Sequence, residues 1–403
     1  MKNNLLKRAN KHVFFGSQKT SILFLVLVYI LFSAIVHAYI GTKPFEQNYY
    51  DSYKLQAQNW LSGKIAFENN YDWLEMAIYN NKYYISFPPS PALIALPFVA
   101  VFGDSFSSAV LCEIYSIISL ITLYLILNKY IDNKTSALLA FLLIFASPYI
   151  SIFTSGAVWH HAQCLSLCCV LTSIYFADNK KPTLSLFMLA VGIGARPFNI
   201  LYVFPILFLF RERKLKIKAV IKALLVFSLI GLMYAGYNYI RFNNIFEFGH
   251  NYLPEFSENS KQFSIKHLIK NLQKFIIGTP FYLTPENNIF IREFGFSLLI
   301  AVPSVSIYIV VFICDVVKKR INLATSITFA VFIINSILLL SHKTMGGFQL
   351  GARYFIDCLS YPVLHIIFTN GKSFKTSALR IILLLLILTL IFLFISNKYF
   401  VLS

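Results

Sequence analysis

The sequence predicts an all-α polytopic membrane protein, with about 11 transmembrane helices and two large extracytoplasmic loops. Of its 403 residues, 57% are hydrophobic and only 13% are charged, and the mean hydropathy is +0.66. One water-soluble core could not hide so many apolar side chains. Eleven apolar runs have a length at or near that of a bilayer span, and short basic clusters lie between them.

The first apolar run, residues 20–41, follows a basic leader. We therefore expect residues 1–19 to be a cytoplasmic N-terminus and residues 20–403 to form a single transmembrane domain. The run contains Val36-His37-Ala38, which loosely matches the cleavage site of a signal peptide. Its apolar length, about the 20 residues that a bilayer core requires, instead favours an uncleaved anchor.

Ten further runs follow along the chain, and most are long enough to span a membrane. They cover residues 105–127, 134–152, 161–177, 183–196, 198–210, 219–240, 294–314, 322–341, 353–369 and 377–396. Together with the first run they number eleven. An odd number of spans places the two termini on opposite sides of the membrane.

The distribution of charge predicts which loops are cytoplasmic and which lie outside the membrane. Basic clusters such as "RERKLKIK" (211–218) and "KKR" (318–320) fall between runs in the loops expected to be cytoplasmic, whereas most acidic residues lie in two long loops, 42–104 and 241–293. Cytoplasmic loops of membrane proteins carry an excess of Lys and Arg. The N-terminus is therefore expected inside, and the two long loops and the C-terminus outside.

One pair of runs is too short for two ordinary spans. Only 28 residues, 183–210, separate two cytoplasmic basic clusters. Each leg would be about 20 Å of helix at ~1.5 Å per residue, against a bilayer core of ~30 Å. The tip, "GIGARPFN" (192–199), would hold Arg196 below the outer surface, because broken backbone inside a membrane is tolerated where it lines a wet cavity or is buried in protein.

Arg196 and Arg353 are candidate binding residues because arginine inside a membrane costs at least ~2.5 kcal/mol and therefore faces a polar cavity or has a partner. In "FQLGARYF" (348–355), Arg353 stands at the outer start of a helix, where its guanidinium could bind a phosphate with two hydrogen bonds. The alternative for both is snorkelling of the side chain towards the outer headgroups.

The first outer loop begins with Asp51 in "YYDSYKLQAQNWL", which predicts a helix from Ser52. Asp51 has two interpretations. It is a good N-cap for that helix. Its carboxylate, close to the headgroup level, is also placed to act as a general base towards a hydroxyl whose partner is anchored in lipid. The later segment 87–103 is expected to lie on or shallowly in the membrane.

Two further pairs of polar residues are candidates. Asp72 and Glu75 are three apart and would share one helical face, either as a metal pair or sugar contact or as solvated loop acids. His160 and His161, in "SGAVWHHAQ", are expected at an outer helix end, either as donors to a phosphate or sugar or as ordinary capping residues. Glu113 lies inside a membrane run and is expected to pair internally.

The sequence lacks the signatures of soluble nucleotide-dependent enzymes, of nucleic-acid-binding proteins and of cysteine metal sites. The sequence has no Gly-rich phosphate loop, no G-x-S-x-G, no H-E-x-x-H and no CxxC. The basic residues form short clusters rather than one stripe, so nucleic acid is not an expected partner. The six cysteines all fall within apolar runs without metal-ligand spacing, and they are expected to be small core residues.

The order of several segments resembles the GT-C superfamily of polytopic glycosyltransferases, in particular bacterial proteins similar to protein mannosyltransferases and to lipid A aminoarabinose transferase. The segments are Asp51 ahead of "LQAQNWLSGK", then "NNKYYISFPPSPALIALPFVAVFG", "GIGARPFN", "YIRFNNIFEFGHNY" and "GFQLGARYFIDCLSYPVL". The resemblance covers most of the chain and implies an enzyme of the cell envelope, in a bacterial inner membrane.

The resemblance also implies a reaction. Its members use a polyprenyl-phosphate-linked sugar as donor and an acid of the first outer loop as base. Asp51 would then be the base, and Arg353 with Tyr354, assisted by Arg196, would hold the donor phosphate while outer-loop tyrosines, Tyr84 among them, contact the sugar. The acceptor would be a hydroxyl of a glycan, lipid or protein, with inversion at the sugar. The loop has no D-x-D or E-x-D pair, so no cofactor and no divalent metal are expected.

Two other functions fit parts of the same pattern. A transporter or flippase for a lipid-linked or anionic substrate would also have broken helices and membrane-embedded arginines, although the large outer loops and the missing inverted repeat speak against it. A polymerase or ligase of lipid-linked glycans would use the same outer Arg and His residues but would transfer chains instead of single sugars.

Overall fold

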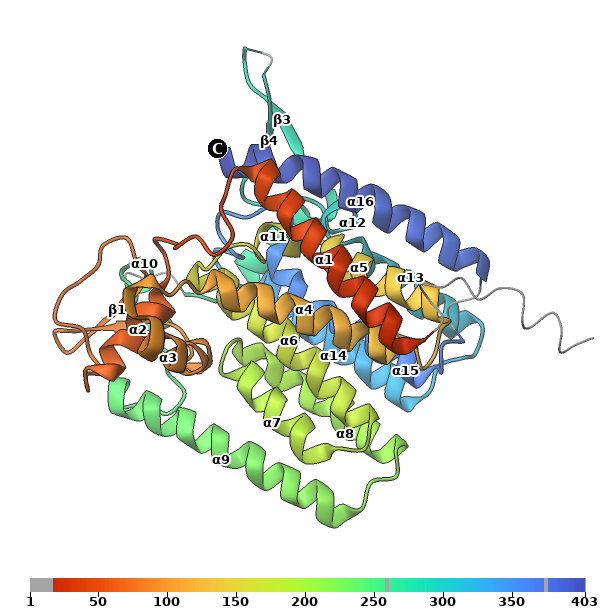
Figure 1. The fold of residues 1–403 in the computed structure, drawn as a ribbon, viewed down its shortest axis with the longest axis horizontal. Helices are drawn as coiled ribbons and strands as arrows, with labels where there is room; N and C mark the ends of the chain where they lie inside the picture. Colours follow the sequence, from red (N-terminus) through yellow and green to blue (C-terminus); the bar gives the residue numbers. More distant parts are fainter. Residues whose placement is uncertain (1–16, 258–260, 287, 373–375, 403) are drawn as a thin grey trace, which may run out of the picture.

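A computed structural model describes residues 17–257, 261–286, 288–372 and 376–402, and these residues are mostly helical (Figure 1). The elements of the first half are α1 (Gln18–Ile40), α2 (Ser52–Leu61), β1 (Met76–Tyr79), β2 (Lys82–Ile85), α3 (Ser90–Phe102), η3 (Gly103–Ser105), α4 (Ala109–Leu127), α5 (Asn133–Phe145), η4 (Pro148–Ser151), α6 (Val158–Asp178) and α7 (Pro182–Ile193).

The second half continues with η5 (Pro197–Tyr202), α8 (Val203–Glu212), α9 (Ile217–Phe242), η6 (His250–Tyr252), α10 (Pro254–Ser257), α11 (Ile265–Ile277), β3 (Phe281–Leu283), β4 (Ile289–Ile291), α12 (Leu298–Ala301), α13 (Pro303–Val317), α14 (Leu323–Leu340), η7 (Arg353–Cys358), α15 (Ser360–Phe368) and α16 (Thr376–Leu402).

Five of the described helices are long and apolar enough to cross a membrane: α1, α4, α9, α14 and α16. They run side by side in one bundle, with α9 and α16 at opposite edges (Figure 1). On α9, Leu225 and Leu232 are 67% and 68% exposed, as side chains that face lipid would be. All eleven predicted runs fall on helices, which supports an integral membrane protein, whereas the number of spans stays a prediction.

The two predicted outer loops carry their own structure. Helices α2 and α3 and the β1–β2 hairpin lie together at one end of the bundle, next to the C-terminal part of α9 (Figure 1). Helices α10 and α11 and the β3–β4 hairpin belong to the second loop. We call the end of the bundle that carries residues 42–104 and 241–293 the loop end. The all-α prediction is wrong here in one respect, because each loop contains a two-stranded antiparallel sheet.

The β1–β2 hairpin has a local cause that was present in the sequence. Its register pairs Met76 with Ile85 and Tyr79 with Lys82, and the turn residues Asn80 and Asn81 both have positive φ, at 50° and 57°. A two-residue turn of this kind matches the twist of the strands, and asparagine tolerates it better than most residues. The dipeptide Asn-Asn between two runs rich in tyrosine therefore predicts a hairpin.

The short hairpin predicted for residues 183–210 is confirmed. Helix α7 has 12 residues, the chain turns at Gly194, Ala195 and Arg196, and η5 and α8 lead back. At the opposite end Asp178 accepts hydrogen bonds from Lys129 and Arg213, each at 2.5 Å. These ion pairs tie the end of α8 to the end of α6 and to the loop before α5. They therefore anchor the end of the hairpin that lies opposite Arg196.

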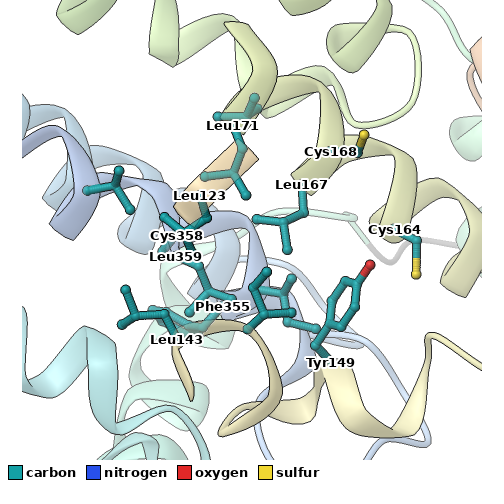
Figure 2. Close-up of a cluster of buried hydrophobic side chains, with 14 of the residues drawn as sticks. Leu123, Leu143, Tyr149, Cys164, Leu167, Cys168, Leu171, Phe355, Cys358 and Leu359 are labelled. Atoms are coloured by element: carbon teal, nitrogen blue, oxygen red, sulfur yellow. The ribbon is translucent and has the colours of Figure 1, made fainter. Parts of the chain in front are cut away.

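The core brings together segments that are distant along the chain. Figure 2 shows Leu123 of α4, Leu143 of α5 and Leu167 of α6 packed against Phe355 and Cys358 of η7, with further buried side chains of the same helices around them. The prediction of cysteines as core residues is confirmed for five of the six, since only Cys314 is exposed. The prediction for Glu113 is also confirmed, because it accepts hydrogen bonds from Tyr29, Ser33 and His37.

Candidate functional site

A cavity of about 1090 Å³ opens at the loop end of the bundle. Its walls come from the end of α1, the start of α6, the tip between α7 and η5, both outer loops and residues 342–354. A pocket where several elements converge around a few polar side chains is the default candidate for a binding site.

Arg353 forms one wall of the cavity and is 3% exposed. Its Nη2 donates to the carbonyl of Gly346 at 2.9 Å and its Nη1 points at Gln163 Oε1 at 3.4 Å, while Nε has no hydrogen-bond partner. Within the described residues no carboxylate lies within 4 Å of this guanidinium. A buried cation with no carboxylate in direct contact is costly, so the arrangement favours an anionic ligand.

Arg196 reaches the same wall from the hairpin tip but has a partner. Its Nε and Nη2 donate to Asp357 Oδ2 at 2.9 and 2.8 Å. Its guanidinium lies 4.5 Å from the ring of Tyr354, and that of Arg353 lies 5.5 Å from the same ring. The structure therefore brings together Arg196, Arg353 and Tyr354, the three residues to which the family resemblance assigns the donor phosphate.

Glu75 also lines the cavity. Its Oε1 accepts a hydrogen bond from Trp159 Nε1 at 3.1 Å, and among the described residues Oε2 accepts none. Burial raises the pKa of Glu75 to about 7; the hydrogen bond from Trp159 opposes the rise, the charge of Glu255 adds to it and that of Arg353 reduces it. A carboxyl with a pKa near neutral is suited to exchange protons with a substrate.

The two histidines have different positions. His160 lines the cavity, and its Nδ1 has no hydrogen-bond partner among the described residues. His161 is fully buried behind it, with its ring 5.4 Å from Tyr53 and 5.8 Å from Tyr115. Successive residues of a helix point about 100° apart, and in this pair only His160 faces the cavity.

Asp51 is the N-cap of α2, as one of its two interpretations predicts. Its Oδ1 accepts from the backbone of Lys54 at 3.1 Å and from Ser108 Oγ at 2.9 Å, and its Oδ2 accepts from the backbone of Ser108 at 3.1 Å. It is 9% exposed and does not line the cavity. Burial raises its pKa to about 6, and its hydrogen bonds limit the rise.

Asp72 and Tyr84 lie away from the cavity lining. The prediction that Asp72 and Glu75 share a helical face is wrong, because residues 71–75 form a turn that leads into β1. Asp72 is exposed and accepts a hydrogen bond from Asn70 at 2.6 Å. Tyr84, on β2, is 7% exposed and packs against Phe242.

Sequence reasoning missed several residues of the site. Gln163 donates to the carbonyl of Arg353 at 2.9 Å and to Asp357 Oδ1 at 3.2 Å. Asp357 could have been found, because it follows Arg353 by four residues in an apolar run and a carboxylate there needs a partner. His342 also lines the cavity, and burial lowers its pKa to about 3, so its ring is neutral.

Within the part of the chain that the structure describes, no three His, Cys, Asp or Glu side chains are grouped so that they could hold a metal ion. The acidic residues at the cavity are spread over its lining, at Glu46, Glu75, Glu247 and Glu255. Independence from divalent metal stays a prediction.

Comparison with solved structures gives the fold. The chain superposes on the oligosaccharyltransferase of the archaeon Archaeoglobus fulgidus in its apo form with a TM-score of 0.53, at 12% identity, over 98% of this chain and 56% of that chain. The chain therefore shares the fold of this part of the oligosaccharyltransferase. No family model and no curated protein matches the sequence.

Two further structures of that oligosaccharyltransferase superpose on the chain equally well. In complex with an inhibitory peptide and a dolichol-phosphate, the neighbour has a TM-score of 0.51 at 13% identity, over 93% of this chain and 55% of that one. The structure of the enzyme tethered to an acceptor peptide with the NVT sequon has a TM-score of 0.53 at 13% identity. This superposition covers 94% of this chain and 55% of that one. The chain thus spans about half the length of the structures it matches.

Proposed function

We propose that this protein transfers a monosaccharide from a polyprenyl-phosphate-linked donor to a hydroxyl acceptor at the outer face of the membrane. One observation carries the proposal: a buried arginine without a carboxylate partner, Arg353, and a carboxyl with a raised pKa, Glu75, line the same cavity. The GT-C fold supports glycosyl transfer as the type of reaction.

The reaction is a single displacement at the anomeric carbon. The acceptor oxygen forms a bond to that carbon, the bond from the carbon to the donor phosphate oxygen breaks, and the configuration inverts. Glu75 Oε2 takes the proton of the acceptor hydroxyl. Arg353, with Arg196 and Tyr354 beside it, binds the phosphate and stabilises the charge that develops as it leaves. The lipid phosphate stays in the membrane.

Glu75 is a better base than Asp51 for a geometric reason. Both oxygens of Asp51 accept hydrogen bonds from α2 and Ser108, outside the cavity lining. Glu75 lines the cavity, and among the described residues its Oε2 accepts no hydrogen bond. A general base must come within hydrogen-bond reach of the proton that it removes. We therefore assign the base to Glu75 and keep Asp51 as the cap of α2.

The structural neighbours suggest the partners. One of their structures holds a dolichol-phosphate and another an acceptor peptide. By analogy we propose a lipid-linked donor and a protein acceptor for this chain, with a glycan or lipid hydroxyl as alternatives. The bacterial inner membrane, with the N-terminus in the cytoplasm, is the proposed location.

The test uses purified protein with a panel of polyprenyl-phosphate sugars, and measures release of the lipid phosphate and formation of glycosylated product. We expect Glu75→Gln to lose transfer by about 10²- to 10⁴-fold, the usual contribution of a general base. Asp51→Asn keeps the size of the cap and should lose less than tenfold.

Loss in Asp51→Asn with full activity in Glu75→Gln would return the base to Asp51. Movement of donors across vesicle membranes without release of lipid phosphate would instead show a flippase. Products extended by whole glycan chains would show a polymerase or ligase.

A further inference from the structure

Helix α11 has three different faces. Phe275 and Asn271 are buried against the protein, and Asn271 donates to the carbonyls of residues 340 and 342 at 2.8 and 2.9 Å. On a second face Ile265, Ile269 and Ile276 are 75%, 64% and 59% exposed. A helix with a bare apolar face beside basic residues is typical of one that lies in a membrane interface.

The third face contributes to a pocket of about 660 Å³ that shares no lining residue with the first cavity. Lys270 and Lys274 of α11 and Arg292, which follows β4, line it, with Glu293 as its one acidic residue. Among the described residues none of these three cations has a carboxylate within 4 Å. Burial, then the charges of Lys270 and Arg292, lower the pKa of Lys274, so the pocket gathers three cations against one carboxylate.

The β3–β4 hairpin stands beside this pocket and projects beyond the helices (Figure 1). Arg292 Nε donates to Thr279 Oγ1 at 3.3 Å, which ties the cation to the start of the hairpin. Phe281, Leu283 and Ile289 on the strands are 45%, 67% and 70% exposed. Apolar side chains therefore flank the cationic pocket on both sides.

We propose that this pocket binds the phosphate of an anionic phospholipid of the outer leaflet, with the acyl chains against the apolar face of α11 and the hairpin. The three basic side chains of the pocket favour an anionic headgroup. The exposed isoleucines of α11 favour a ligand that also has acyl chains. A soluble phosphate compound would use the cations but would leave the apolar surface in water, at a cost proportional to its area. The site is distinct from the proposed transfer site, and its test is independent of transfer.

The experiment measures lipid binding to the purified full chain by native mass spectrometry, with phosphatidylglycerol and phosphatidylcholine as probes. Lys270→Gln with Lys274→Gln should weaken phosphatidylglycerol binding by roughly tenfold or more, since each basic side chain near anionic lipid contributes. Lys64→Gln with Lys82→Gln, two exposed lysines of the first loop, is the matched control and should bind as the wild type does. Phosphatidylcholine binding should not change.

Depth in the membrane gives a second measurement that leaves the charges intact. A fluorophore on Ile276→Cys, in a Cys314→Ser background, should be quenched by lipid-borne nitroxides in phosphatidylglycerol vesicles, and one on Lys82→Cys should not. Equal phosphatidylglycerol binding by the two double variants would overturn the proposal, as would an unquenched probe at 276. Displacement of the lipid by soluble glycerol 3-phosphate at equal concentration would show a site for soluble phosphate instead.

Discussion

At the scale of single residues, Arg353 shows how the fold prepares a cation for a ligand. Its backbone N–H donates to Gln349 Oε1 at 2.7 Å, and Gln349 in turn donates to the carbonyl of Met345 at 2.6 Å. These contacts fix the backbone while Nε stays without a partner. The guanidinium is therefore held in position but not neutralised.

We expect Arg353→Lys to reduce transfer even though the charge is kept, because an ammonium group cannot reproduce a planar contact with two hydrogen bonds. Loss of one charge-assisted hydrogen bond costs about 1.5–3 kcal/mol, or roughly tenfold to over a hundredfold in rate or affinity. Steady-state transfer and donor affinity measure it. Wild-type values for both would support a snorkelling arginine, since lysine snorkels equally well.

The pH dependence of transfer reports on Glu75. Its pKa is raised from 4.5 to about 7, so the carboxyl is protonated, and unable to accept a proton, below that pH. We expect kcat/KM to rise as pH increases through about 7. Trp159→Phe removes a hydrogen bond to the ionised carboxylate, so the rise should move to higher pH by roughly 1–2 units.

Trp73→Phe is the control for that shift, because Trp73 is exposed, stacks on Tyr49 and does not line the cavity. A pH profile that is the same in Trp159→Phe and Trp73→Phe would show that Glu75 is not the titrating group. A profile centred near pH 4.5 in the wild type would contradict the raised pKa.

At the scale of elements, the site depends on tight backbone contacts between segments. Gly295 has φ of +91°, and a Cβ there would press on the carbonyl oxygen of Gly351. The segments around Gly295 and Gly351 are also joined by a backbone hydrogen bond, which Gln349 N–H donates to the carbonyl of Glu293 at 2.7 Å. Arg353 is only two residues beyond Gly351, so this contact sets the position of the cavity wall.

We therefore expect Gly295→Ala to destabilise the protein by about 1–3 kcal/mol, the usual cost of overpacking, and to lower transfer as well. Gly63→Ala is the matched control. Gly63 also has positive φ, +73°, but no atom lies within 4 Å of its added Cβ. Thermal unfolding of both variants separates the steric clash from backbone strain, and equal midpoints would contradict the proposed contact.

At the scale of the whole molecule, the orientation in the membrane can be tested with two exposed lysines. Lys82 is the first residue of β2, at the loop end, and Lys214 lies between α8 and α9 at the opposite end of the bundle (Figure 1). In a Cys314→Ser background, Lys82→Cys should react with a membrane-impermeant maleimide added to intact cells, and Lys214→Cys should not. Labelling only at 214 would invert the orientation.

The sequence by itself determined the positions of the helices, the short hairpin at 183–210 and the cap as one of two interpretations of Asp51. Each of these follows from local causes: the length of an apolar run, the distance between two basic clusters, and a side chain that reaches its own backbone. The order of motifs also indicated a resemblance to polytopic glycosyltransferases, and a solved oligosaccharyltransferase has the same fold over most of this chain. The turn of the β1–β2 hairpin has a local cause as well, since two asparagines in succession tolerate the positive φ that it requires.

Only the tertiary structure decided which polar residues share a cavity. Arg196, Arg353 and Tyr354 meet because the α7–α8 tip packs on η7, and Glu75 joins them because β1 places the preceding turn beside Trp159. His161, Asp72 and Tyr84 lie as near to site residues in the sequence but do not line the cavity. The direction of a side chain depends on how distant segments pack, and no local pattern contains that information.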